Sequence, residues 1–397
     1  MLSVKNPIMT GFFPDPSICR VGNKFYTVHS TFAYFPGVPV FESEDLVHWN
    51  LISNVLDRDS QVPLSGCQHS EGIFAPTIRY HKGTWYMITT NVSDQGNFIV
   101  TAKDPRGPWS EPYYLGESTG GIDPSLFFDD DGTCYYIGQR PRSAGYRYNG
   151  DCEIWIQTLD LDTMQLKPDA TIVLTGFQRK AIWPEGPHLY KKDGYYYILH
   201  AESGTSIHHS VMIARSKNVF GPYEYCPCNP ILTHRHLGAQ YPVTCVGHAD
   251  LVDDGNGNWY MVVLACRPNQ GYTLLGRETF LAKVTWEDGW PVVNAGVGHL
   301  EEVVTLPYEG QPSDDVPQCK TYTFDTPSLP LELLTLRNHR DHELELHAEE
   351  HIVRLFHRCD SLKDCGEPAY LALRQQHWNC EFETSFIPHF CKESDCA

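Results

Sequence analysis

A pattern that recurs five times along the chain constrains its fold more than any other feature. Each copy has a turn containing glycine, followed by an apolar run rich in aromatic residues. One tyrosine in each run serves as a marker: Tyr26, Tyr86, Tyr136, Tyr196 and Tyr260. Successive markers are 60, 50, 60 and 64 residues apart. Repeats of this length that contain hairpin signals are typical of β-propellers, in which each repeat forms one blade.

Further strand-like segments surround the marker runs. A short one precedes each run, and a third follows most of them, for example at residues 98–104 and 211–216. Three or four strands in each of five repeats predict an all-β chain with a five-bladed β-propeller over residues 1–300. No helical periodicity interrupts the series, which disfavours a TIM barrel. A β-sandwich with accidental internal similarity stays open as the alternative.

The composition changes after the fifth repeat. Residues 301–320 are rich in proline and aspartate, which indicates a linker. Residues 321–397 contain strand-like pieces at 342–348, 349–356 and 380–386, too few to close a β-sandwich. We therefore expect the incomplete start of a C-terminal β-sandwich-like domain, apparently truncated.

Charge and composition exclude several kinds of partner. The formal net charge is −19 and no long basic run is present, which argues against a nucleic acid or an anionic membrane surface as partner. No apolar stretch reaches the length of a transmembrane helix. Aromatic residues make up 12% of the chain, which suits a β-rich core and leaves some rings to stack on sugars.

Cellular location is inferred from the N-terminus and the cysteines. No signal peptide is visible, and the 14 cysteines are scattered, so we expect a cytoplasmic protein with free thiols. A signal removed from the chain would make it secreted instead. The sequence leaves the oligomeric state open, with a homo-oligomer as one alternative.

The first strands of the five repeats place ionisable residues at corresponding positions. These positions hold Asp15, Ala75, Asp123, Glu185 (after one inserted residue) and His248. In a propeller they meet around the central channel, where crowded and desolvated carboxylates repel one another, so that the pKa of at least one should rise. A protonated acid beside an ionised base is what glycoside cleavage requires. Taken singly, each Asp-Pro pair could be a turn former.

Four segments together resemble glycoside hydrolase family 43. They are NPIMTGFFPDPSICR at residues 6–20, STFAYFPG at 30–37, GIDPS at 121–125 and WPEGP at 183–187. The resemblance is to the β-xylosidases and α-L-arabinofuranosidases that carry a C-terminal β-sandwich. It implies an exo-acting, inverting enzyme that releases terminal β-D-xylose or α-L-arabinofuranose from xylo- or arabino-oligosaccharides. It also implies that Asp15 is the general base, Glu185 the general acid and Asp123 the group that tunes the pKa of Glu185.

The resemblance extends to residues that would hold the sugar. Arg277 matches an arginine that contacts sugar hydroxyls, and Phe32 and Phe74 match aromatic walls of the pocket, although many relatives have tryptophan at the second position. Thr205 would lie near the site. His248 matches a hub histidine that lies beside a calcium ion or a water cluster in many relatives, so no cofactor is required but Ca²⁺ near His248 stays open.

Three other kinds of propeller protein would be expected to show different sequence features. A sugar-binding propeller without catalysis would be expected to lack one of the three carboxylates. An invertase-like enzyme would carry Asn-Asp-Pro-Asn near its start, and a sialidase-like enzyme would carry Asp-boxes and an arginine triad. The histidine pairs at 208–209 and 234/236 could suggest metal ligands. Neither pair has a third ligand at a persuasive spacing, so we expect these histidines to be loop residues near the rim.

Overall fold

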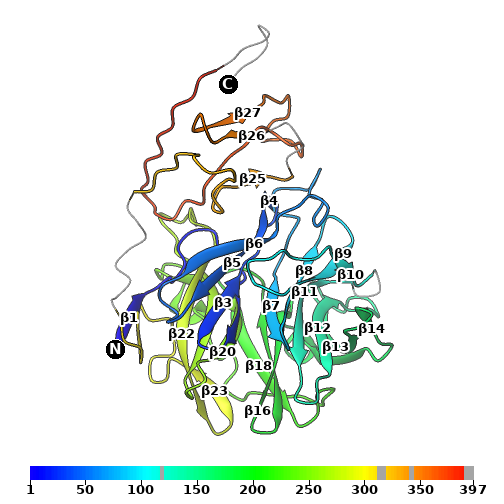
Figure 1. Cartoon of the computed structure of the whole chain (residues 1–397). Helices are drawn as coiled ribbons and strands as arrows, with labels where there is room; N and C mark the ends of the chain where they lie inside the picture. Colours follow the sequence, from blue (N-terminus) through cyan, green and yellow to red (C-terminus); the bar gives the residue numbers. More distant parts are fainter. Residues whose placement is uncertain (117–119, 311–318, 339–343, 389–397) are drawn as a thin grey trace.

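The computed structural model describes residues 1–116, 120–310, 319–338 and 344–388 (Figure 1). Five antiparallel sheets are arranged around a central axis, which confirms the five-bladed propeller. The innermost strands of the five sheets are β2 (Ser17–Val21), β7 (Thr77–His81), β11 (Ile122–Phe128), β16 (Glu185–Lys192) and β20 (Thr244–Asp253). Each contacts the next, and β20 contacts β2, which closes the ring.

The marker tyrosines lie on, or at the start of, the second strands, as the repeat pattern predicted. The second strands are β3 (Lys24–Val28), β8 (Thr84–Asn91), β12 (Cys134–Pro141), β17 (Tyr195–Glu202) and β21 (Trp259–Cys266). The third strands are β5 (Gly37–Ser43), β9 (Gly96–Ala102), β13 (Cys152–Asp160), β18 (Ser210–Ser216) and β22 (Glu278–Glu287). The outer strands are β6 (Asn50–Leu56), β10 (Tyr113–Tyr114), β14 (Gln165–Leu166), β15 (Thr171–Thr175), β19 (Glu224–Tyr225) and β23 (Trp290–Val293).

Aromatic side chains fill the space between blades. Tyr26 of the first blade packs against Trp85 of the second at a centroid distance of 4.6 Å. Tyr197 of the fourth blade packs against Trp286 of the fifth at 5.1 Å. Such edge-to-face contacts stabilise the interface beyond the burial of apolar area. Short 3-10 helices lie in connections at η1 (Phe177–Arg179) and η2 (Arg235–Leu237).

The expected linker at 301–320 is partly built into the propeller. β24 (Val303–Leu306) pairs with β1 (Leu2–Lys5), so the two ends of the propeller sequence are hydrogen-bonded to each other. Val304 and Leu306 are fully buried there. These four residues are therefore a strand and not part of a linker. Their alternating apolar side chains indicate a strand, but the prolines that follow make the segment as a whole resemble a linker. Residues 311–318 of the expected linker lie outside the described residues.

The C-terminal segment covers one face of the propeller (Figure 1). β25 (Thr335–Leu336) pairs with β4 (Tyr34–Phe35), and the hairpin of β26 (Leu344–His347) and β27 (Ile352–Leu355) lies farther out. The strand expected at 380–386 is not formed, since those residues are exposed and unpaired in the structure. No helix in the described part of the chain has the length and apolar character needed to cross a bilayer.

Candidate active site

A shared backbone conformation sets up the hub. Asp15, Asp123 and His248 have φ angles of 53°, 54° and 52°, in the left-handed region that non-glycine residues rarely adopt. Gly186 has φ of 57°, and like Asp15 and Asp123 it directly precedes a proline. The structure thus refines the sequence alignment. Gly186 occupies the repeat position of the two aspartates, and Glu185 lies one residue before it.

Irregularities in strand pairing aim these side chains. The register of β11 with β12 shifts between Ile122 and Ser125, around Asp123. The register of β16 with β17 shifts directly after Glu185, and that of β20 with β21 shifts on both sides of Gly247. A β-bulge bends a strand and redirects a side chain. Three of the five inner strands therefore carry a bulge at the site.

Asp15 is held as a carboxylate. The Ser30 hydroxyl donates to its Oδ2 at 2.6 Å, and Arg277 Nη1 donates to its Oδ1 at 2.9 Å. His248 Nδ1 lies 4.0 Å from the same Oδ1. Burial alone would raise the pKa of Asp15, but Arg277, His248 and the Ser30 hydrogen bond outweigh it and lower the pKa below its usual value. Asp15 is therefore ionised at neutral pH.

Glu185 and Asp123 have the opposite character. Burial, and then repulsion from Asp123 and Asp15, raise the pKa of Glu185 well above its usual value. Burial also raises the pKa of Asp123, to about 6, with repulsion from Asp15 adding to it and the positive influence of His248 opposing it. The Gly186 N–H donates to Asp123 Oδ2 at 3.1 Å. The repulsion between these two buried carboxyl groups makes each easier to protonate than a free carboxyl.

Aromatic rings and a guanidinium form one wall beside Asp15. Phe32 lies between Phe12 and Phe74, at centroid distances of 5.7 and 5.2 Å. Arg277 stacks over Phe32 at 4.8 Å. The structure therefore brings the predicted Phe32, Phe74 and Arg277 together. The sequence reasoning missed Phe12, although it lies three residues before Asp15 within a segment that carried the resemblance.

His248 does not have the surroundings of a protein-held calcium site. Calcium takes six to eight oxygen ligands. The nearest carboxylate, Asp15, already accepts hydrogen bonds through both oxygens from Ser30 and Arg277. Among the described residues, no group of three or more His, Cys, Asp or Glu side chains is arranged to hold a metal ion. The side chains described near His248 therefore do not fit Ca²⁺.

The loop after β17 carries two residues considered in the sequence analysis, His209 and Thr205. His209, expected on the rim, is 1% exposed and its Nε2 lies 4.0 Å from Glu185 Oε1. It escaped detection because a short loop after β17 turns it inward, which its exposed neighbour His208 does not reveal. Thr205 is exposed on the same loop. Its contact with a sugar stays a prediction.

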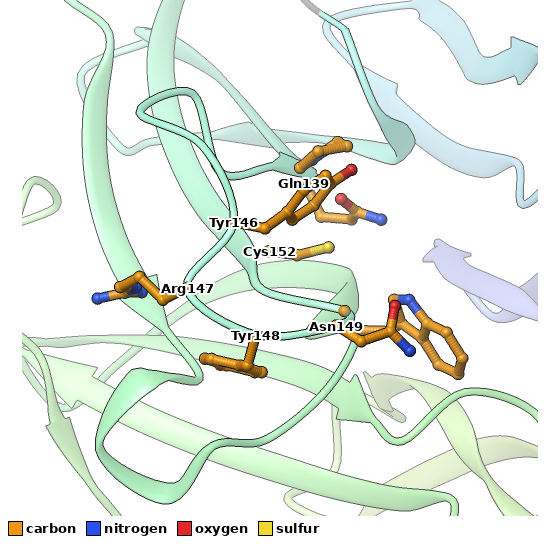
Figure 2. Close-up of a pocket in the computed structure, with 9 residues that line it drawn as sticks. Gln139, Tyr146, Arg147, Tyr148, Asn149 and Cys152 are labelled. Atoms are coloured by element: carbon orange, nitrogen blue, oxygen red, sulfur yellow. The ribbon is translucent and has the colours of Figure 1, made fainter.

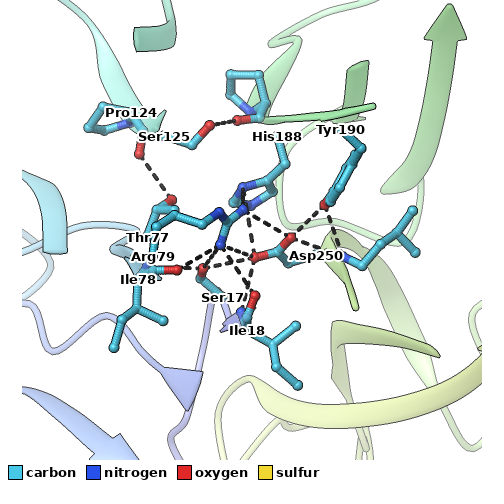
Figure 3. A network of polar contacts seen from close by, with 12 residues as sticks. Ser17, Ile18, Thr77, Ile78, Arg79, Pro124, Ser125, His188, Tyr190 and Asp250 are labelled. Carbon is cyan, nitrogen blue, oxygen red and sulfur yellow. Dashed lines mark hydrogen bonds and ion pairs between the residues drawn. The ribbon is translucent and has the colours of Figure 1, made fainter. Parts of the chain in front are cut away.

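Below the site, a buried ion pair fills the hub (Figure 3). The Arg79 guanidinium donates to Asp250 Oδ2 at 3.0 Å and to Ser17 Oγ at 3.2 Å, and it also contacts His188 Nδ1 at 3.2 Å. The Tyr190 hydroxyl donates to Asp250 Oδ1. Strands β2, β7, β16 and β20 are thereby tied together. The network fixes the inner strands whose first residues form the site.

A cavity of about 450 Å³ is lined in part by Cys152, a residue whose thiol pKa is raised by burial and by the charge of Glu185. Figure 2 shows Tyr146, Gln139 and Cys152 close together, with the Arg147 side chain pointing away from them. Trp183, two residues before Glu185, also lines the cavity and is 41% exposed. The cavity thus lies on the Glu185 side of the hub, whereas the phenylalanine wall lies on the Asp15 side.

Comparison with known proteins identifies the family. Residues 4–291 match the profile of Glycosyl hydrolases family 43, and residues 321–397 match the Beta xylosidase C-terminal Concanavalin A-like domain. The chain belongs to glycoside hydrolase family 43. This confirms the resemblance carried by the four segments, and the chain is a glycoside hydrolase of the xylosidase/arabinosidase group of this family. Its C-terminal residues therefore belong to a concanavalin A-like β-sandwich domain, of which the described part forms β25, β26 and β27.

Relatives of this family 43 chain cover nearly all of it. A xylosidase/arabinosidase of Butyrivibrio fibrisolvens is 55% identical across 100% of this chain and 77% of its own length. A non-reducing end α-L-arabinofuranosidase of Bacteroides ovatus is 41% identical across 97% of this chain and 71% of its own. The crystal structure of a xylan β-1,4-xylosidase from Bacillus halodurans superposes with a TM-score of 0.85, at 39% identity, over 94% of this chain and 72% of that one.

Proposed function

We propose that this chain is an exo-acting, inverting hydrolase that removes terminal β-D-xylose or α-L-arabinofuranose from xylo- and arabino-oligosaccharides. The opposite pKa shifts of Asp15 and Glu185 are the observation that carries the mechanism, because they provide an ionised base and a protonated acid in one hub. The sugar class is supported by the relatives, whose names cover xylosidases and arabinofuranosidases.

The proposed chemistry is a single displacement. Asp15 removes a proton from water, whose oxygen attacks the anomeric carbon. The bond to the leaving oxygen breaks, and Glu185 gives that oxygen its proton. Asp123 keeps the pKa of Glu185 high by its charge and orients the acid segment through the Gly186 N–H. Proton exchange with solvent then restores Glu185 as acid and Asp15 as base.

The two sides of the hub would hold different parts of the substrate. We assign the terminal sugar to the side of Phe32, Phe74 and Arg277, where rings and a guanidinium can meet its apolar face and hydroxyls. The leaving group would lie in the cavity lined by Tyr146 and Trp183, the latter lying two residues before Glu185. The segment 372–378 approaches the first side closely, since a Cβ on Gly11 would come within 2.5 Å of Gln375 O. Such crowding favours a chain end over a chain interior.

One comparison tests this function. Wild type should release 4-nitrophenol from 4-nitrophenyl β-D-xylopyranoside or α-L-arabinofuranoside, whereas Asp15→Ala and Glu185→Ala should lose about 10³-fold or more in kcat/KM. Proton NMR of the first-formed sugar should show inverted anomeric configuration. Absence of activity on both glycosides in folded wild-type protein would contradict the proposal, and retained configuration would contradict the assigned roles.

A further inference from the structure

A buried histidine faces the acid side of the site without a hydrogen-bond partner at one nitrogen. The side chain of His209 is fully buried, and its Nδ1 lies 3.0 Å from the carbonyl oxygen of Cys245. A carbonyl only accepts hydrogen bonds, so Nδ1 carries the hydrogen. In the described structure Nε2 is buried and unpaired. It lies 4.0 Å from Glu185 Oε1.

The backbone is shaped to place this ring. The Gly247 backbone packs directly against the imidazole of His209, since a Cβ on Gly247 would come within 2.4 Å of His209 Cγ and Cδ2. Gly247 lies between the two register shifts of β20, and Cys245, whose carbonyl anchors Nδ1, has φ of 59°. The same bulge presents His248 to Asp15. An imidazole seated on a glycine and anchored at one nitrogen has a fixed orientation, with its other nitrogen toward Glu185.

The ring remains neutral over the working pH range. Burial lowers the pKa of His209 to about 4, with the positive influence of His248 adding to the effect and the Cys245 contact and Asp15 opposing it. Nε2 is therefore an acceptor, not a donor. The charged groups that act on Glu185 are Asp123, Asp15 and Arg277, and its negative charge also acts on the Cys152 thiol nearby.

We propose that His209 is a positioning residue for the general acid, whose Nε2 accepts the Glu185 O–H between turnovers. The distance of 4.0 Å is longer than a hydrogen bond, so the proposed contact requires the Glu185 side chain to move toward Nε2. Catalytic hydrogen bonds are often long before substrate binds. The contact is available only to protonated Glu185, so it keeps this residue in its acid form until a leaving oxygen takes the proton. The inference rests on the proposed role of Glu185.

The variant His209→Asn keeps the interaction made by Nδ1 and removes the one made by Nε2. The asparagine amide can reach the Cys245 carbonyl from the position of Nδ1 but offers nothing at the position of Nε2. We expect kcat on xylobiose, whose departing xylose is a poor leaving group that needs the acid, to fall about tenfold. We expect kcat on 2,4-dinitrophenyl β-D-xyloside, which needs no acid, to change less than about twofold. The alkaline limb of the pH profile should move down by about 0.5–1 pH unit, because one hydrogen bond to the acid form is lost.

The neighbouring exposed His208→Asn is the matched control and should match wild type on both substrates. Equal losses on both substrates, or an unmoved alkaline limb, would overturn the proposal while leaving the enzyme assignment intact. Inactivity of wild type on both would instead reject the proposed function. If His209→Asn does not fold, ¹⁵N NMR of wild type decides: Nδ1–H and bare Nε2 at pH 7, with an Nε2 signal that changes in Glu185→Gln, support the proposal, and an Nε2–H tautomer overturns it.

Discussion

The imidazole of His248 lies against the α-carbon of Gly186, so closely that a Cβ there would come within 2.9 Å of its Cε1. This contact joins the two halves of the site across neighbouring inner strands. On one side, the Gly186 N–H holds Asp123 at 3.1 Å and Glu185 is the preceding residue. On the other, His248 Nδ1 lies 4.0 Å from Asp15. A single glycine therefore sets how near the acid segment comes to the base.

Gly186→Ala should separate these halves. The added Cβ meets the His248 ring, and alanine is strained at φ of 57°. We expect kcat/KM to fall about 10²-fold, because sub-ångström displacement of reacting groups is costly. Gly194→Ala is the matched control. Gly194 lies in the hairpin turn of the same blade at φ of 73°, and a Cβ there would approach only Lys217 Nζ, at 3.9 Å. Equal loss in both variants would mean that backbone strain, not the ring contact, is responsible.

The pH profile should reveal the charge of Asp123. Repulsion from Asp123 helps to raise the pKa of Glu185, so Asp123→Asn should lower that pKa. Glu185 must be protonated to act, and the alkaline limb of kcat/KM should therefore move to lower pH, by about one unit. The acid limb should follow Asp15, whose pKa is already below its usual value. Asp131→Asn, in an exposed turn of the same blade, should leave both limbs unchanged. A limb that moves upward would contradict the proposed electrostatics.

Most of the fold, and the positions of the three carboxylates, could be predicted from the repeat pattern. Tyr26 and its four counterparts mark equivalent strands, and equivalent strands in a closed ring must bring their first residues together. Asp15, Asp123 and His248 could therefore be located from spacing alone, and the matching φ angles reflect that symmetry. The symmetry failed at Glu185, because the inserted residue hides that Gly186 is the equivalent of the aspartates.

Residues outside the repeat pattern could not be found in this way. His209 belongs to a loop whose inward turn depends on packing against Gly247, nearly forty residues later in the chain. Arg79 is the third residue of an inner strand and looks like a surface charge until Asp250 is seen opposite it. β24 pairs with the first strand of the chain across some three hundred residues. Contacts of this range leave no local periodicity in a single sequence.

Replacing Arg277 should disturb both charge and binding. Arg277→Met removes the cation that most lowers the pKa of Asp15. The base would then protonate at higher pH, so the acid limb of kcat/KM should move upward. We also expect a loss of about 10²–10³-fold at the optimum, because a buried charge-assisted contact is lost. Arg106→Met removes a guanidinium that is 53% exposed on the outer surface and should leave the profile unchanged. An unmoved acid limb in Arg277→Met would contradict the pairing.

Chelation should leave activity unchanged. The oxygens of Asp15 accept hydrogen bonds from Ser30 and Arg277, and a second buried guanidinium, Arg79, is paired with Asp250. We therefore expect dialysis against EDTA to change kcat/KM less than about twofold, since the described side chains around His248 include no cluster of three or more His, Cys, Asp or Glu arranged to hold a metal ion. Added Ca²⁺ should not raise it. A loss on chelation that Ca²⁺ reverses would show a cation site formed by main-chain oxygens and water near His248.

Removing one partner of the Arg79–Asp250 ion pair should lower the free energy of unfolding more than replacing both partners. The Asp250 side chain is fully buried and that of Arg79 is 15% exposed. Removing one partner leaves a buried charge uncompensated, so Arg79→Met or Asp250→Asn should lower the free energy of unfolding by about 3–5 kcal/mol.

The double variant Arg79→Met/Asp250→Leu should recover much of this loss, because it removes both charges, and urea unfolding of all three variants measures the difference. Burial tends to raise the pKa of Asp250, but Arg79, His188 and Tyr190 lower it to about 2. Its contribution is therefore present above the unfolded-state value of about 3.9 and is lost as pH falls toward 2. A double variant less stable than either single one would show that the pair stabilises the hub through its hydrogen bonds to Ser17 and Tyr190, beyond mutual neutralisation.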